Sequence, residues 1–169
     1  MNLRHAILAA PLALLAACAG DETTIHTLST GTFAVSGATA ANTSPGDGCG
    51  LLDLYAPQPP EEAKQFGATV TGSSIAFDFT FRTPIDPDTV ITASLTDNAI
   101  ATTDDADFLA NPGGDCSVRT VRSVTGSLTS VDAMELTMDL TSTVESGDCS
   151  AWGEYPCTSN IQFLATTAQ

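Results

Sequence analysis

The sequence has 169 residues and is strongly acidic: 20 aspartates and glutamates stand against 5 lysines and arginines, which gives a formal net charge of −15. A surface with this charge repels the phosphates of nucleic acids, so the composition excludes nucleic-acid binding and is typical of a solvated acidic coat. The length fits a single domain that buries its own core without needing a metal ion to fold.

The first segment of the chain is typical of a secretory signal peptide. Arg4 precedes an apolar run over residues 6–17, and this run is too short and too weakly flanked to span a membrane as a helix of the mature protein. The following residues are polar and rich in turn-forming residues. We therefore expect a signal peptide over residues 1–17, a flexible tether over residues 18–30 and a single domain over residues 31–169.

The signal peptide ends in "LAAC", Leu15-Ala16-Ala17-Cys18, which resembles the signal box of bacterial lipoproteins. The resemblance implies that the Cys18 thiol receives a diacylglyceryl group, that cleavage occurs before Cys18 and that the new amine is acylated. Two or more acyl chains hold a protein stably on a membrane. The next residue is Ala19 rather than the aspartate that implies retention in the inner membrane. The resemblance therefore implies a cell-envelope protein anchored in the outer membrane.

Two segments alternate between apolar and polar residues, which is the pattern of half-buried antiparallel strands. They are "SIAFDFTFR" (74–82) and "MELTMDLTS" (134–142), and weaker alternation follows at 31–37 and 160–165. We count seven or eight strands. This count predicts an all-β fold, either an antiparallel β-sandwich of the immunoglobulin-like type or a small β-barrel. The residues expected to face the core in the two clear segments are Ile75, Phe77, Phe79, Phe81, Met134, Leu136, Met138 and Leu140.

A local similarity favours the sandwich. The stretch "IAFDFTFRTPIDPDTVITASLTD" (75–97) resembles the strand–loop–strand segment of bacterial immunoglobulin-like domains. In those domains an alternating strand is often followed by the order Pro-x-Asp-Pro-x-Thr-Val, which residues 84–90 carry. The resemblance implies two strands of such a domain over residues 75–97.

Four cysteines remain for the domain once Cys18 carries lipid, and an even number in an exported chain predicts disulfides. Three of them stand in turn-like stretches, "PGDGC", "GGDC" and "SGDC", where glycine supplies positive φ and aspartate bonds the backbone of its own turn. A zinc site needs closely spaced cysteine pairs or histidines, whereas the mature chain has no CxxC and only His26. We therefore expect no metal and no cofactor. The disulfide cysteines are Cys49, Cys116, Cys149 and Cys157.

Two pairings compete. The easy closure of the short loop "CSAWGEYPC" favours Cys149–Cys157, which leaves Cys49–Cys116. The alternative comes from hairpin register, in which strands around residues 118–129 and 134–145 pair about a turn near residue 131. That register brings Cys116 opposite Cys149 and leaves Cys49–Cys157.

The loop 149–157 is a candidate contact surface. It carries the only tryptophan, Trp152, beside Tyr155, and aromatic side chains on a rigid loop are typical anchors of an interface. The alternative is that Trp152 folds back to cap the core, because large aromatic side chains are usually buried.

The acidic stretch 97–115 is a second candidate, because calcium takes six to eight oxygen ligands from carboxylates and carbonyls. The stretch lacks the central glycine and closing glutamate of a helix–loop–helix calcium loop, and charge runs are more often simply solvated. The carboxylates that would form such a site are Asp104, Asp105, Asp107 and Asp115.

The sequence offers no catalytic constellation. His26 lies in the predicted tether, the thiols are expected in disulfides, and the single lysine, Lys64, has no serine motif beside it. We therefore expect a non-catalytic module, structural or binding, that meets the membrane through its lipid and an envelope protein or surface ligand through the domain. The alternative is a calcium-dependent adhesion or ligand-binding module that uses the acidic loop 97–115.

Overall fold

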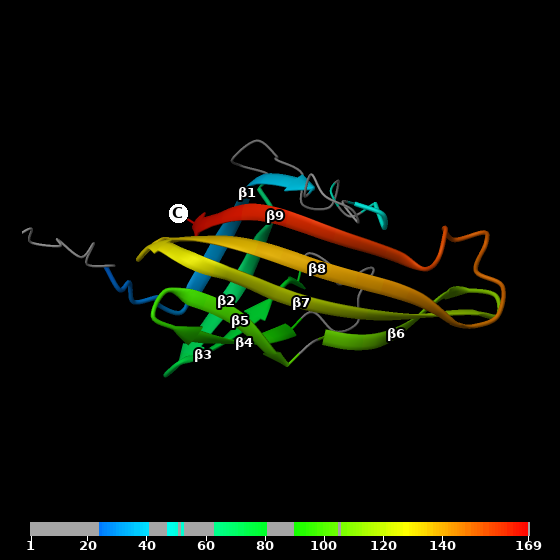
Figure 1. Cartoon of the computed structure of the whole chain (residues 1–169), viewed down its shortest axis with the longest axis horizontal. Helices are drawn as coiled ribbons and strands as arrows, with labels where there is room; N and C mark the ends of the chain where they lie inside the picture. The colour runs from blue at the N-terminus through cyan, green and yellow to red at the C-terminus, as the bar shows by residue number, and fades with distance from the viewer. Residues whose placement is uncertain are drawn as a thin grey trace, which may run out of the picture.

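The computed structural model describes residues 24–40, 47–50, 52, 63–80, 90–104 and 106–168. The predicted signal peptide and Cys18 lie outside these residues. The nine elements that form in the described part of the chain are all β-strands, so the all-β prediction is confirmed (Figure 1). Among the described residues, no helix is long and apolar enough to cross a membrane.

The strands vary in length, and the longest follow one another in the second half of the chain. They are β1 Gly31–Ala40, β2 Gln65–Thr71, β3 Ser74–Asp78, β4 Val90–Thr96, β5 Ala99–Asp104, β6 Ala106–Gly113, β7 Cys116–Ser130, β8 Ala133–Ser146 and β9 Cys157–Thr167.

All nine strands belong to one antiparallel sheet, in the order β5-β4-β3-β2-β1-β9-β8-β7-β6. β5 also pairs with β7, with Ile100 opposite Gly126, and this pairing closes the sheet into a ring. The expected sandwich of two packed sheets is therefore wrong, and nine strands replace the seven or eight expected. The ring is not an even barrel, because β7 is long enough to pair with β5 near one end and with β6 near the other.

The alternating segments form strands with the expected faces. In β3, Ile75 and Phe77 are buried, and Phe79 stays buried just beyond the end of the strand. In β8 the four apolar residues from Met134 to Leu140 are buried, and Glu135 between them is exposed. Phe81, the last apolar residue of the first pattern, lies outside the described residues. The two strands expected within residues 75–97 are β3 and β4, which are neighbours in the sheet.

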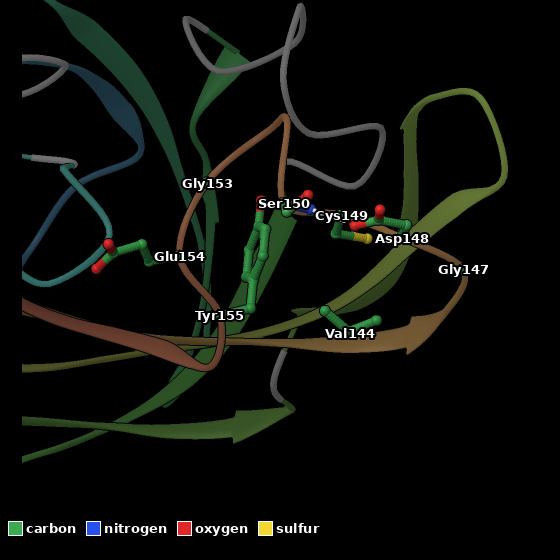
Figure 2. A pocket seen from close by; sticks show the side chains of 8 residues that line it. All are labelled: Val144, Gly147, Asp148, Cys149, Ser150, Gly153, Glu154 and Tyr155. Carbon is green, nitrogen blue, oxygen red and sulfur yellow. Dashed lines mark hydrogen bonds between the residues drawn. The ribbon is translucent and has the colours of Figure 1, made fainter.

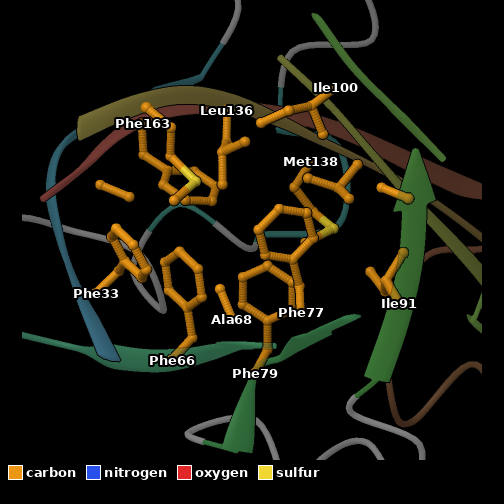
Figure 3. Close-up of a cluster of buried hydrophobic side chains, with 14 of the residues drawn as sticks. Phe33, Phe66, Ala68, Phe77, Phe79, Ile91, Ile100, Leu136, Met138 and Phe163 are labelled. Atoms are coloured by element: carbon orange, nitrogen blue, oxygen red, sulfur yellow. The ribbon is translucent and has the colours of Figure 1, made fainter. Parts of the chain in front are cut away.

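Five phenylalanines fill the interior of the ring, and Phe66 contacts each of the other four (Figure 3). The ring centroids lie between 4.8 and 6.3 Å from that of Phe66, in stacked, tilted and edge-on arrangements. Such aromatic pairs stabilise a core by about 0.5–1.5 kcal/mol each beyond the area that they bury. The partners are Phe33, Phe77, Phe79 and Phe163.

Gly126 permits the closure of the ring. It lies in β7 between Ile100 of β5 and Leu136 of β8. A Cβ atom at this position would stand 2.1 Å from the Glu135 carbonyl oxygen, which is closer than any real contact. A side chain at position 126 would push β8 away from β7, and β7 is also the strand with which β5 pairs to close the ring.

Part of the predicted tether belongs to the domain. The Asn98 side chain donates a hydrogen bond to the Thr24 carbonyl (2.7 Å) and accepts one from the His26 amide (2.8 Å). Leu28 is buried in the core, and Thr30 Oγ1 accepts a hydrogen bond from the Val70 amide. Residues 24–30 are therefore docked rather than free, because an apolar side chain and local polar partners hold them.

The sheet has two distinct ends. The tight turns at residues 72–73, 97–98 and 131–132 lie at one end, together with Thr24 and the end of β9, and we call this the turn end (Figure 1). The opposite end carries the β6–β7 turn at residues 114–115 and the loop 147–156, which joins β8 to β9, and we call these two segments the tip.

Candidate functional site

The tip is formed where β6, β7 and the end of β8 run on toward the far end of the molecule (Figure 1). The loop 147–156 folds over the inner face of β7 and β8 there and covers a small core of its own. This core consists of Cys116, Val118 and Cys149, with Tyr155 packed against them. The tip is therefore a second, smaller packing unit, separate from the phenylalanine core.

Two disulfides hold the tip, and the pairing favoured by loop closure is wrong. Cys116 is bonded to Cys149, and Cys49 is bonded to Cys157. The register of the β7–β8 hairpin decides this, because Ser117 lies opposite Ser146 and brings the start of β7 to the residues just after β8.

The second disulfide is set by the start of β9. Asp47 forms an isolated bridge with Ser159, and the Ser159 hydroxyl both donates to Asp47 Oδ1 (2.8 Å) and accepts from the Cys49 amide (2.9 Å). These contacts place Cys49 beside Cys157. The ends of the loop "CSAWGEYPC" are therefore bonded to Cys116 at the start of β7 and to Cys49 in the turn after Asp47, and not to each other.

The Gly-Asp-Cys stretch at 147–149 acts through turn chemistry. Gly147 has a φ of 77°, and a Cβ atom there would stand 2.0 Å from the Asp115 carbonyl oxygen. Asp148 Oδ1 accepts a hydrogen bond from the Ser150 amide at 3.0 Å, which lowers the pKa of the Asp148 carboxyl. The repeated motif thus brings two turns into contact beside a disulfide, and Asp148 stays ionised near neutral pH.

An open hollow of about 700 Å³ lies between the end of β8 and the loop 147–156 (Figure 2). Val144, Cys149 and the ring of Tyr155 give it an apolar wall, and Val144 is 44% exposed there. Asp148 and Glu154 add two carboxylates, and no residue that lines the hollow carries a positive charge. The hollow is suited to a cationic or neutral group with an apolar body.

Trp152 and Tyr155 do not face the same space. Tyr155 lines the hollow, whereas Trp152 lies against Gly113 at the end of β6, where an added Cβ atom would stand 2.6 Å from Trp152 Cζ2. The indole remains 53% exposed. Trp152 therefore does not cap the core, and its exposed face is free for contact on the outside of the tip.

The predicted acidic loop is two strands, so its carboxylates are separated. Asp104 ends β5 opposite Thr92, Asp107 lies in β6, and Asp115 stands in the β6–β7 turn. The six-residue step from Asp107 to Gly113 alone covers roughly 20 Å of extended strand. Within the described residues no group of three or more His, Cys, Asp or Glu side chains could hold a metal ion. Asp105, the fourth predicted ligand, lies outside them.

Asp107 forms an ion pair with a neighbouring strand instead of a metal site. Its carboxylate accepts a hydrogen bond from the Arg119 guanidinium on the adjacent strand β7. This hydrogen bond and the charge of Asp107 raise the pKa of Arg119, with a smaller contribution from Glu145. Both side chains are about half exposed, so solvent screens the pair and it contributes little to stability.

The disulfide pairing can be determined by proteolytic digestion, because the chain has a cleavage site between each cysteine of the domain and the next one. Trypsin cleaves after Lys64 and Arg119, and a glutamate-specific protease cleaves after Glu154. Non-reducing digestion of the folded, oxidised protein should yield one linked peptide pair with Cys116 and Cys149 and another with Cys49 and Cys157. A peptide pair that joins Cys149 to Cys157 would contradict the structure.

The two bonds should also differ in their effect on stability. Their sequence separations are 33 and 108 residues, for which the loss of chain entropy on cross-linking corresponds to about 4 and about 5 kcal/mol. Replacing Cys116 and Cys149 together with alanine should lower the urea midpoint less than replacing the other pair does.

The side chains at the tip provide apolar contact and negative charge, and they come from segments that the two disulfides fix in place. The positions of these groups therefore depend on the two covalent bonds as well as on the small core of the tip. No family model, curated protein or solved structure matches this chain.

Proposed function

We propose that this protein is a lipid-anchored lipoprotein of the bacterial cell envelope, attached to the outer membrane through Cys18, and that its domain acts by binding rather than by catalysis. The apolar run and the "LAAC" motif support the anchor. The hollow and the exposed indole of Trp152 support the tip as the contact surface.

One observation carries the proposal: the described chain begins at the turn end, and the tip lies at the opposite end (Figure 1). A domain attached to a membrane through its N-terminus at one end keeps the other end accessible. The most exposed aromatic side chain of the described residues and the open hollow are both found at that accessible end.

The charges at the tip define the kind of partner. Asp148 and Glu154 line the hollow, and the chain as a whole carries −15, so an anionic partner is repelled. A protein segment or surface ligand with lysine or arginine side chains is attracted, and its aliphatic stems suit the apolar wall formed by Val144 and Tyr155.

Intact mass tests the anchor. Protein purified in detergent from membranes should begin at Cys18 and carry the added mass of a diacylglyceryl group and an amide-linked acyl chain. The Cys18→Ser variant, expressed in the same way, should lack this mass and leave the membrane fraction. A mature wild-type form that begins at Ala19 or later without acyl mass would refute the lipoprotein proposal.

Site-specific photo-crosslinking tests the tip. A photoreactive phenylalanine at position 152, in place of Trp152, should give a discrete adduct in living cells. The same residue in place of Thr141, which is exposed on the face of β8 opposite to Val144 and the hollow, should not. The adduct should weaken when Asp148→Asn and Glu154→Gln are combined, because the attraction for a cationic partner is removed. Equal labelling at positions 152 and 141 would contradict binding at the tip.

A further inference from the structure

We infer that the turn end of the domain is held close to the bilayer surface and that the tip points away from it. This inference rests on the proposed lipid anchor and adds the orientation of the domain to it. The docked segment 24–30, the length of chain that precedes it and the side chains exposed at the turn end carry the inference.

The point at which the chain leaves the domain is fixed. Asn98, in the β4–β5 turn, bonds Thr24 through its amide nitrogen and His26 through its amide oxygen. The Asn98 carbonyl in turn accepts a hydrogen bond from the Leu128 amide of β7, which ties this turn to the long hairpin. Leu28 is only 3% exposed, so the segment cannot leave without opening the core. Thr24 is therefore a rigid part of the turn end.

The reach of the chain before Thr24 is short. Six Cα–Cα steps separate Cys18 from Thr24, and they span at most about 22 Å in any conformation. The lipidated residue and the turn end are therefore always near each other. β7 alone has 15 residues, and its 14 steps cover roughly 46 Å of strand from the β7–β8 turn to the tip. Because the domain is attached at the turn end and is this long, the tip can lie as close to the membrane as the turn end only if the domain lies flat on the bilayer.

Charge favours an upright position, whereas exposed apolar side chains occur at both ends, with Trp152 and Val144 at the tip. Ile25 is 64% exposed beside Asn98, and Val131 is 53% exposed in the β7–β8 turn. Apolar side chains at the attached end gain by contact with the interfacial region of a bilayer. Both ends carry exposed carboxylates, Asp97 and Asp132 at the turn end and Asp148 and Glu154 at the tip. A flat arrangement brings both sets close to anionic headgroups and an upright one brings only the first, so their charge opposes the flat arrangement.

The chain supplies its own probe, because Trp152 is the single tryptophan and lies in the tip. The lipidated protein is reconstituted in vesicles of phosphatidylethanolamine and phosphatidylglycerol that contain a dansyl-headgroup lipid, and energy transfer from tryptophan is measured. In a second protein, Trp152→Phe is combined with Val131→Trp, which moves the donor to the turn end. Since energy transfer to a layer of acceptors falls steeply with distance from that layer, the loss of donor emission should be several-fold greater for tryptophan at position 131 than at position 152.

Control proteins separate this inference from the proposed function. Both donors should show no transfer in proteins that begin at Ala19 and lack lipid. Ile25→Trp in place of Val131→Trp repeats the test at a second exposed position of the turn end. If the protein carries lipid but both donors transfer equally, or position 152 transfers more, the orientation is wrong while the anchor stands. If the purified protein carries no lipid, the proposed function itself fails.

Discussion

The pairing of β5 with β7 is the contact on which the rest of the structure depends. Without it, the chain would form an open nine-stranded sheet whose apolar face, with its five clustered phenylalanines, stayed exposed to water. The pairing closes that face around Phe66 and leaves the first part of β7 free to continue with β6 and β8 to the tip. It requires a bare backbone at Gly126, because β8 approaches that residue from the other side.

The core and the tip are stabilised in different ways. The interior of the ring gains stability from apolar burial, which is proportional to area and needs no cross-link. The tip has only a small core around Cys116 and Val118, so covalent bonds to the loop and to the segment at Cys49 take over much of that role. This division leaves Val144 and Trp152 exposed at a rigid end of the molecule, where contact with a partner costs little conformational entropy.

The sequence predicts a strand where apolar and polar residues clearly alternate. It predicts which strand pairs with which only where a short turn fixes the register of a hairpin. The alternation in 134–142 predicted both β8 and its buried face, and the turn near residue 131 contained enough information for the Cys116–Cys149 bond. The strands in 97–115 were missed, because their polar and acidic residues show no period of two. The closure at Ile100 and Gly126 joins residues far apart in the chain, which local patterns do not report. Arg122 is fully buried at an inward position of β7, although arginine by itself indicates a surface residue.

The closure of the ring is tested most directly by cross-strand nuclear Overhauser contacts at Gly126, which has a partner on each side. Backbone contacts are expected from Gly126 both to Leu136 of β8 and to Ile100 of β5, since directly opposed residues in antiparallel strands lie about 4.5–5.5 Å apart. The contacts to Leu136 serve as the internal reference. If they are present while those to Ile100 are absent, β5 is an open edge, and the closed ring described above is contradicted.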